Sequence, residues 1–188
     1  EAVLDLLRTG SYEIEPRMAL DIRILVGGRE DGARQHVALN DAAVVRASEA
    51  RFVRLGVRID DSHLATFTAD GVIVATPTGS TAYALAAGGP ILPPALRNIL
   101  IVPVAPHFSV DRAVVLHEGS TVRITVRTDH QATLSMDGQP PVDVQDGDQV
   151  EVRAGDHTVQ FVRLQDPGYF YRDLRRRMRR NETDGAAA

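Results

Sequence analysis

Apolar and polar residues alternate along much of this chain. From Tyr12 to Ile24 apolar side chains fall at nearly every second position, with one break at Pro16. A period of two is typical of a β-strand that buries one face. The same alternation, or a short apolar run, predicts further strands at residues 36–39, 43–46, 52–59, 64–67, 72–75, 99–104, 113–116, 121–128, 131–136, 149–153 and 158–164. Many short strands at regular spacing predict a mainly β, multi-stranded, β-sandwich-like domain.

Turn signals separate these strands, and helical patterns are few. Glycine and aspartate mark turns at residues 27–32, 60–62, 118–119, 137–138, 146–147 and 155–156. We expect the end of a helix at residues 2–9, stopped by Gly10, and one short internal helix near residues 82–87. An amphipathic helix is expected from Phe170 to Arg180, with apolar residues at a spacing of four.

The expected organisation is one β-rich domain with helical ends. Residues 1–10 form the end of an inter-domain helix, and residues 11–168 form the β-rich domain. Residues 169–181 form a C-terminal helix that packs on the core, and residues 182–188 form a frayed tail. The first helix lacks a start of its own, so we expect the chain to begin partway through a larger protein.

Composition narrows the classes of protein to consider. The 188 residues are 44% apolar, which suits one domain with a real core, and there is no cysteine for a disulfide or a catalytic thiol. All 21 basic residues are arginine, which excludes a P-loop or Schiff-base lysine in this chain. The net charge of −4 argues against a nucleic-acid binder. No apolar run is long enough to cross a bilayer and no signal peptide is apparent, so we expect a cytoplasmic protein without membrane contact.

The segment from Asp70 to Pro90 is the most constrained part of the sequence. A buried strand at residues 72–75 leads into the string Thr-Pro-Thr-Gly-Ser-Thr-Ala-Tyr and then into a helical run of small residues. This order leaves backbone N–H groups at a helix start, with Ser80 or Thr81 as candidate N-caps. Such a place suits a phosphate, a ribose hydroxyl or an amide. The alternative is a tight strand-to-helix connection with ordinary capping.

With the segment from Asp70 to Pro90, this chain resembles the C-terminal domain of the NAD kinase family. Four further strings, elsewhere in the chain, occur in the order expected of that family. They are Ala-Leu-Asn-Asp at residues 38–41, Pro-Val-Ala-Pro-His at 103–107, Met-Asp-Gly-Gln at 136–139 and Tyr-Phe-Tyr-Arg-Asp-Leu at 169–174. The resemblance spans roughly residues 4–178, which is nearly the whole chain.

The resemblance implies an activity, a substrate and partners. Members of the family transfer a phosphoryl group from ATP or polyphosphate to the 2′-hydroxyl of the adenosine ribose of NAD, giving NADP. Mg²⁺ or another divalent cation accompanies the donor, and members form homodimers or homotetramers. The family's Gly-Gly-Asp-Gly motif supplies the catalytic aspartate from an N-terminal α/β domain and is absent here, since residues 27–32 read as a hairpin turn. We therefore expect no catalytic residue and no metal site in this chain, and little or no activity from the chain alone.

The resemblance also assigns NAD contacts to particular residues. They are Asn40, Asp41, Arg51, Asp70, Thr81, Ala82, Tyr83, Ala86, Ala105, His107, Asp137 and Gln139. An asparagine and an aspartate suit a ribose, because an amide both donates and accepts and a carboxylate accepts from hydroxyls. Asp70 suits the nicotinamide carboxamide, and Tyr83 offers a flat face to a ring. Where the family commonly has serine this chain has Ala86, so one hydroxyl contact is missing.

For each of these positions the residues alone also allow a plain structural role. Asn40 and Asp41 fit an Asx turn, and Asp137 with Gly138 is a strong hairpin signal. Arg51 fits a solvated strand arginine, and Asp70 fits a turn before Gly71. Ala105 and His107 lie on a loop expected near the dinucleotide of this subunit or of a neighbouring one. The remaining histidines lack metal-ligand spacing, and the arginines at residues 175–180 suit a helix C-terminus.

Two other functions are considered. A domain of many strands needs its edges covered, so the chain could be a non-catalytic β-rich assembly or regulatory module. The lipid-kinase superfamily, which includes diacylglycerol and sphingosine kinases, shares the two-domain plan. No apolar groove pattern favours the lipid kinases, and the string from Thr76 to Tyr83 favours NAD.

Overall fold

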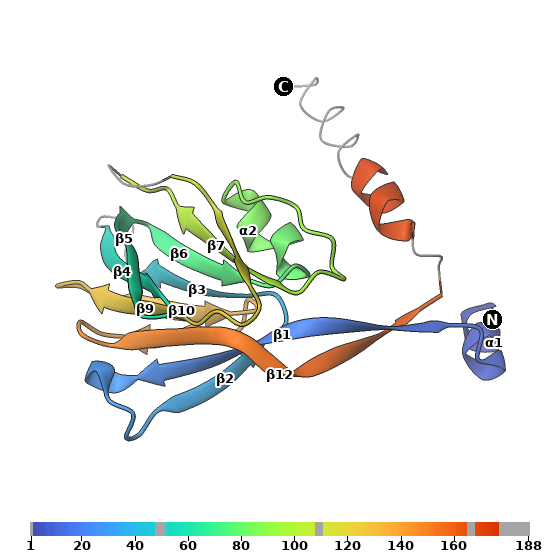
Figure 1. Ribbon diagram of the computed structural model, residues 1–188, viewed down its shortest axis with the longest axis horizontal. Coiled ribbons are helices and arrows are strands. Elements are labelled where there is room, and N and C mark those ends of the chain that lie inside the picture. The colour runs from blue at the N-terminus through green and yellow to red at the C-terminus, as the bar shows by residue number, and fades with distance from the viewer. Residues whose placement is uncertain (1, 48–51, 108–110, 165–167, 177–188) are drawn as a thin grey trace. The chain divides into compact units, whose positions relative to one another are not determined.

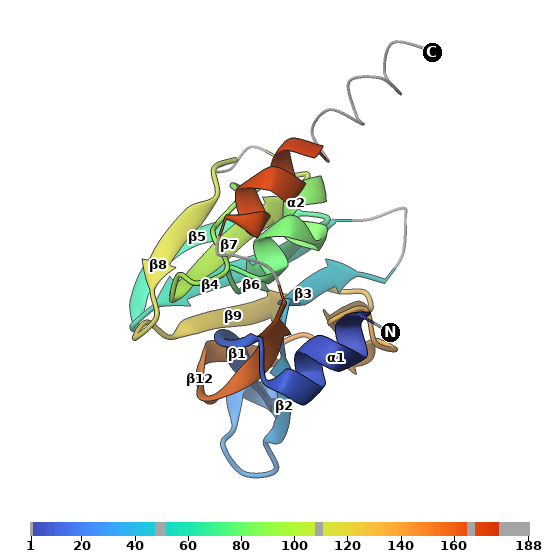
Figure 2. The same ribbon diagram turned by 90° about the vertical axis from the view of Figure 1, so that its right-hand side faces the viewer.

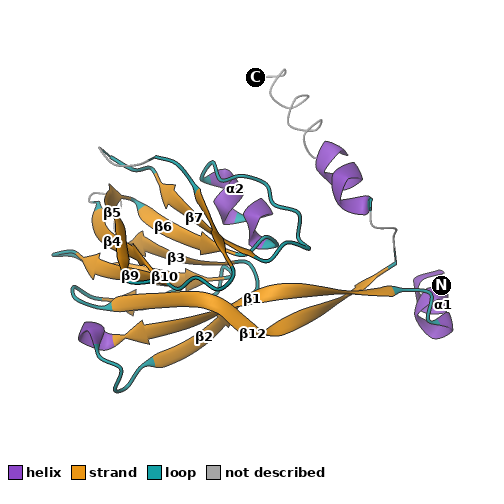
Figure 3. Cartoon of the chain, viewed as in Figure 1, coloured by secondary structure: helices purple, strands orange, loops and turns teal. Residues whose placement is uncertain are grey.

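The computed structural model describes residues 2–47, 52–107, 111–164 and 168–176 of the chain. The chain divides into two compact units, one of residues Arg17–Val159 and one of residues 1–16 with 160–188. The described residues are mainly strand, as Figure 3 shows, which confirms the predicted fold class.

Two six-stranded sheets make up the β-rich part (Figure 1). The first has the strand order β2-β1-β12-β9-β4-β5, where β1 is Glu13–Leu25, β2 is Arg34–Ala38, β4 is Val53–Ile59, β5 is Ser62–Ala69, β9 is Val122–Arg127 and β12 is Gln149–Arg163. The second has the order β11-β10-β3-β6-β7-β8, where β3 is Asp41–Arg46, β6 is Gly71–Ala75, β7 is Asn98–Val104, β8 is Val114–His117, β10 is Ala132–Met136 and β11 is Val142–Val144. Each neighbouring pair in the second sheet is antiparallel.

The main hydrophobic core lies between the two sheets. Val53, Leu55 and Val57 of β4 are buried while Arg54 and Arg58 are exposed, which places one face of the strand in this core. Leu20, Phe67 and Leu134 belong to the same buried cluster and are less than 2% exposed. Burial alternates along β4, β9 and β10, which is why the period-two pattern in the sequence predicted these strands.

The second sheet is also covered on its other face. A smaller buried cluster joins Ala43, Ile73, Ala75, Leu100 and Val102 to Ala84 of helix α2 (Tyr83–Ala86). Figures 1 and 2 both show α2 against this side of β6 and β7. Because both faces of β6 are covered, all five of its residues are buried, as its continuous apolar run predicted.

The helical segments are short. Helix α1 (Ala2–Thr9) ends at Gly10, whose φ of +71° and whose N–H bond to the Leu7 carbonyl form the predicted C-terminal stop. The 3₁₀ turns η1 (Val26–Gly28) and η2 (Gly79–Thr81) precede β2 and α2. A helix also covers residues 169–176, and the remainder of the predicted helix to Arg180 lies outside the described residues.

Three predictions need correction. β12 runs without a break through residues 155–156, where a turn was predicted, and a Cβ atom on Gly155 would lie 2.8 Å from the Oδ1 atom of Asp21. This glycine therefore permits a close approach rather than a turn. β11 was not predicted, because three residues after a proline pair carry too little pattern. Neither Ser80 nor Thr81 caps α2, since its N-cap position is Ala82 and no side chain bonds there.

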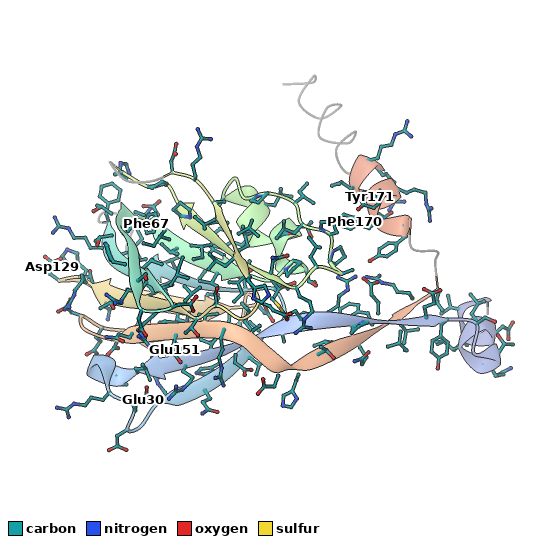
Figure 4. The ribbon with its side chains drawn as sticks, viewed as in Figure 1. Glu30, Phe67, Asp129, Glu151, Phe170 and Tyr171 are labelled. Carbon is teal, nitrogen blue, oxygen red and sulfur yellow. The ribbon has the colours of Figure 1, made fainter. Side chains whose placement is uncertain are left out.

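The unit formed by residues 1–16 and 160–188 has contacts of its own. Arg163 donates from Nε to a carboxylate oxygen of Glu15 at 2.5 Å, and its guanidinium lies 4.1 Å from the ring centroid of Tyr169. Phe170 and Tyr171, labelled in Figure 4, meet edge to face on the helix of residues 169–176. No helix in the described part of the chain is long and apolar enough to cross a membrane.

Candidate functional site

The turn between β2 and β3 lies beside the loop that follows β6. Residues Leu39–Asp41, here called the corner, follow the end of β2 and begin β3, and Asp41 pairs with Ala75 at the end of β6. The N–H of Thr76 donates to the Asn40 carbonyl at 2.9 Å, and the Thr76 hydroxyl donates to the Leu39 carbonyl at 2.6 Å. The two segments expected to hold NAD are thus joined by hydrogen bonds.

Gly79 allows this close approach. A Cβ atom at that position would lie 2.7 Å from the Cα atom of Asn40, and closer still to the Asn40 carbonyl group. The Gly79 N–H also donates to the Thr76 hydroxyl at 3.0 Å. The glycine of the Thr-Pro-Thr-Gly string is therefore needed because backbone meets backbone here.

The hydroxyl groups of Ser80 and Thr81 donate to carbonyl groups within the loop. Ser80 is fully buried, accepts from the Leu92 N–H at 2.9 Å and donates to the Pro77 carbonyl at 2.7 Å. Thr81 donates to the Thr78 carbonyl at 3.3 Å. Side-chain hydrogen bonds of Ser80 and Thr81 thus stabilise the conformation of the loop formed by the string Thr-Pro-Thr-Gly-Ser-Thr.

The residues at the end of this loop and just after it that were predicted to contact NAD are accessible to solvent. Ala82, Tyr83 and Ala86 are exposed, and Thr81 is half-buried. Tyr83 is 44% exposed although it lies on the first turn of α2. An exposed ring on a helix that buries its other face at Ala84 offers an aromatic surface to a ligand.

Asp41 is a buried carboxyl group beside a second carboxylate. It is 6% exposed, and burial together with the charge of Asp137 raises the pKa of Asp41 from its ordinary 3.8 to about 6. Near neutral pH the group is therefore mostly ionised and able to accept from hydroxyls. Asn40, next to it, is half-buried.

The hairpin between β10 and β11 reaches the same corner. Asp137 has a φ of +49° at the tip, and its carboxylate accepts from the N–H groups of Leu39, Asn40 and Asp41. Gln139 is exposed two residues further on, and its N–H closes the turn on the Met136 carbonyl at 2.9 Å. Among the expected contacts, Asn40, Asp41, Thr81, Ala82, Tyr83, Ala86, Asp137 and Gln139 thus lie on the corner, on the β10–β11 hairpin and on the segment from the end of β6 through α2.

The other expected contacts lie at the opposite end of β6. Asp70 precedes that strand, and its carboxylate oxygens accept from Arg46 at 2.7 Å and 3.2 Å. Ala105 follows β7 with a φ of +44°, a strained value for a residue with a side chain. The His107 N–H donates to the Thr68 carbonyl at 2.8 Å, and its ring lies 4.1 Å from that of Phe52. Arg51 lies outside the described residues.

The structure therefore separates the expected contacts into two sets. Six steps of extended chain from Asp70 to Thr76 span about 20 Å at ~3.3 Å per residue. The corner set consists of the eight residues on the corner, the β10–β11 hairpin and the segment from the end of β6 through α2. The far set consists of Asp70, Ala105 and His107. Chain order already puts Asp70 before the predicted strand at residues 72–75 and Thr81 after it. The resemblance to the family, rather than geometry, grouped all of these residues in one site.

Two residues that support the loop were missed in the sequence. Arg17 of β1 is 3% exposed, and its guanidinium donates to the Thr78 hydroxyl at 3.1 Å. Thr76 joins the loop to the corner as described above. Thr76 belonged to the string that drew attention, whereas Arg17 stood in a strand where nothing distinguished it from a solvated arginine.

Other polar features lie away from the corner. A polar hollow of about 300 Å³ on the first sheet is lined by Asp60, Asp61, Thr121, Arg123, Glu151 and Arg153. Glu151, labelled in Figure 4, is 7% exposed and bonds to Arg23 and Arg123. None of the residues expected to contact NAD lines this hollow. Within the described ranges no group of three or more histidine, aspartate or glutamate side chains could hold a metal ion.

Comparison with known proteins adds independent information. Residues 39–164 match the family model described as the ATP-NAD kinase C-terminal domain. An NAD kinase of Chloroflexus aurantiacus is 47% identical over 93% of this chain and 63% of its own length. One of Trichlorobacter lovleyi is 40% identical over 89% of this chain and 59% of its own length. The chain thus spans about three fifths of these curated relatives.

Solved structures agree on the fold. A structure of yeast NADH kinase complexed with NADH superimposes with a TM-score of 0.82 at 29% identity, over 90% of this chain and 50% of that one. An NAD kinase of Archaeoglobus fulgidus in complex with ATP superimposes with a TM-score of 0.72 at 24% identity, which supports the fold alone. The family model covers more than half of the chain, and the two relatives are 47% and 40% identical to most of it. This chain therefore belongs to the family of ATP-NAD kinase C-terminal domains.

Proposed function

We propose that this chain is the NAD-binding part of an NAD kinase, which transfers a phosphoryl group from ATP or polyphosphate to the 2′-hydroxyl of the adenosine ribose of NAD. The family and its named relatives support this reaction. The chain covers 63% of the Chloroflexus relative, so the catalytic aspartate and the grip on the donor are assigned to the remaining part of such a protein. The chain alone is then inactive as a kinase.

The observation that carries this proposal is the junction of the corner with the loop after β6. Asn40 and Asp41 are held there against Thr76 and Gly79. A donor–acceptor amide and an ionised carboxylate side by side suit the two hydroxyls of a ribose. The exposed face of Tyr83 on the same segment suits a flat ring. Positioning of the acceptor hydroxyl is the main requirement of phosphoryl transfer on the acceptor side.

The far set fits a site completed by a second copy of the chain. Asp70 and Asp41 lie at opposite ends of the paired strands β6 and β3, about 20 Å from each other. In a single copy, a ligand that lies within the corner set therefore cannot place adjacent parts of itself on both residues. Ala105 and His107 are exposed at the far end and are free to meet another copy. A homodimer or homotetramer would then provide the far set of one copy to the corner set of the next.

The divalent cation that the family implies is not assigned to residues of this chain. Among the described residues no cluster of side chains has the ligands for such a cation. The lipid-kinase alternative gains no support, since the relatives and structures reported above are NAD or NADH kinases.

Calorimetric titration of the chain with NAD and NADP tests the proposal. We expect measurable heat, and a loss of at least about tenfold in affinity for Asn40→Ala, because an amide that contacts a hydroxyl would be removed. Gln149→Ala removes a half-buried amide on the first sheet and should leave the affinity unchanged. A folded wild-type sample that gives no heat up to millimolar dinucleotide would contradict the proposal. A dimer in sedimentation without any ligand heat would favour the assembly module instead.

A further inference from the structure

Three successive N–H groups of the corner converge on one carboxylate. The Leu39 N–H donates to Oδ2 of Asp137 at 2.7 Å, and the N–H groups of Asn40 and Asp41 donate to Oδ1 at 2.7 Å and 3.1 Å. Consecutive N–H groups that point to one place form a concavity that binds anions. Here the anion is a side chain of the protein itself, which comes from a hairpin 96 to 98 residues away.

The opposite side of the corner is held as well. The carbonyl groups of Leu39 and Asn40 accept from the hydroxyl and the N–H of Thr76. The Asp41 carbonyl accepts from the Asp137 N–H at 3.1 Å. The N–H groups of the corner thus bond to the β10–β11 hairpin, and the carbonyl groups of Leu39 and Asn40 bond to the loop after β6. The side chains of Asn40 and Asp41 are the groups that remain for a ligand.

The backbone of Asp137 is adapted to this contact. Its φ of +49° and the φ of +69° at Gly138 turn the chain sharply at the hairpin tip. Aspartate and asparagine adopt this left-handed region more easily than most residues. Three of the roughly four lone-pair positions of the carboxylate are already occupied by the corner. Little of the group is left for a direct bond to a dinucleotide.

We propose that Asp137 is a positioning residue, which holds the corner so that Asn40 and Asp41 present their side chains to the ligand without itself contacting it. This inference rests on the proposed function in one respect, since the ligand is taken to be a dinucleotide. It differs from the role that the family resemblance implies, in which Asp137 is itself an NAD contact. Burial is the larger cause of the raised pKa of Asp41, and the charge of the same Asp137 carboxylate adds to it.

Asp137→Asn is the variant that separates these roles. Asparagine keeps the size and the tolerance for positive φ, but its NH₂ group replaces an acceptor by a donor that faces a corner N–H. Asp148→Asn is the matched control. Asp148 is 5% exposed and likewise accepts two backbone N–H groups, from Gly27 at 2.8 Å and Gln145 at 2.9 Å, at a turn that carries no expected ligand residue.

Positioning predicts three linked results for Asp137→Asn, measured by NMR and calorimetry. Hydrogen exchange at the amides of Leu39, Asn40 and Asp41 should speed up about tenfold or more, because their acceptor is weakened. The carboxyl ¹³C titration of Asp41 should move to lower pH, because a negative neighbour is removed. NAD affinity should fall about tenfold. Asp148→Asn should lose stability while all three readouts stay at wild-type values.

Two outcomes would overturn the inference. One is an Asp137→Asn variant that loses NAD affinity while the corner amides and the Asp41 titration stay unchanged, as a direct contact predicts. The other is an unchanged affinity with a loosened corner, which would leave Asp137 a purely structural residue. If the wild-type chain itself does not bind NAD, the proposed function fails, but the exchange and titration readouts still test whether Asp137 holds the corner.

A measurement on the wild-type chain covers the case in which the variant does not fold. Scalar couplings across hydrogen bonds, from the amide nitrogens of Leu39 and Asn40 to the Asp137 carboxyl carbon, report the two shortest bonds directly. We expect them in the free chain and unchanged at saturating NAD. Couplings that disappear when NAD binds would mean that the ligand takes the carboxylate, and couplings absent from the free chain would mean that no such bonds exist. Either result overturns the inference.

Discussion

Gly79 lies so close to Asn40 that a Cβ atom on the glycine would stand 2.7 Å from the Asn40 Cα. The corner and the loop after β6 are therefore fitted to each other through their backbones. This contact fixes how the amide of Asn40 and the exposed ring of Tyr83 are presented, although neither side chain takes part in it.

Gly79→Ala should be one of the most damaging small substitutions in the chain. The added methyl group has backbone rather than a flexible side chain in its way, so the corner or the loop must move. We expect a loss of about 1–3 kcal/mol in the free energy of unfolding, together with loss of NAD affinity. Chemical denaturation followed by circular dichroism measures the first and calorimetry the second.

The control for that prediction is Gly56→Ala. Gly56 lies within β4, its φ is not positive, and a Cβ atom there would meet nothing closer than 3.9 Å. Alanine should be tolerated at this position, within about 0.5 kcal/mol. Equal stability of the two variants would mean that the corner and the loop are not in contact.

The raised pKa of Asp41 predicts a specific pH dependence of stability. Its pKa of about 6 in the folded chain lies above its ordinary 3.8, so the folded state binds this proton more tightly. The stabilising contribution is complete below about pH 4 and is lost as the pH rises through about 6, a change of about 3 kcal/mol. Wild-type and Asp41→Asn chains should therefore diverge between pH 4 and pH 7, with the variant gaining relative stability.

Urea denaturation of both chains across this pH range gives the difference directly. Titrating groups remote from Asp41 affect both chains alike and cancel. A difference in unfolding free energy that stays constant with pH would show that Asp41 is not perturbed. Ligand binding should change in the opposite sense, since an ionised Asp41 is the better acceptor for a ribose hydroxyl.

Glu151 predicts the reverse behaviour at lower pH. Burial favours its neutral form, but the hydrogen bonds and charges of Arg123 and Arg23 outweigh this and lower its pKa from 4.5. Its contribution is present above about pH 4.5 and is lost as the pH falls through the folded-state pKa. Glu151→Gln should cost about 2 kcal/mol at pH 7 and should flatten the acid side of the stability profile.

Glu30→Gln serves as the control for Glu151. Glu30 also pairs with Arg23, but its side chain is 69% exposed. An exposed pair of this kind contributes little, so the variant should unfold like the wild type. If Glu151→Gln and Glu30→Gln lower the free energy of unfolding equally, the buried charge network of Glu151 does not stabilise the first sheet.

Mixing two defective variants tests whether a second copy completes the site. Asn40→Ala damages the corner set and Asp70→Asn damages the far set, so each alone should bind NAD poorly. Random mixing makes half of the dimers mixed, and each mixed dimer holds one intact site, so about a quarter of the wild-type sites should return. No recovery after mixing and refolding would place both sets in the same copy or exclude the far set from the site.

Much of the fold could be predicted from the sequence because burial alternates along the strands. β4 buries Val53, Leu55 and Val57 and exposes Arg54 and Arg58, so its period of two was visible in the chain. The fully apolar run of β6 likewise indicated a strand covered on both faces. The glycine at residue 155 was misleading, since glycine marks both turns and close approaches, and only the position of Asp21 distinguishes them.

The candidate site could be predicted only in part. The loop string was singled out because its residue types are unusual together, and the resemblance to the family added the Asn40–Asp41 pair. That Asp137 meets the corner could not be seen, because the bond joins residues almost 100 positions apart. That Ala105 and His107 lie at the same end as Asp70 depends on strand direction and register, which the alternating pattern does not specify.

The most direct test of the account is a ¹H–¹⁵N NMR titration of this chain with NAD. We expect the largest shifts at Asn40, Asp41 and the amides of Thr81–Tyr83, with no comparable change around the hollow near Glu151. Shifts confined to the outer face of the first sheet, or none at millimolar NAD, would contradict it.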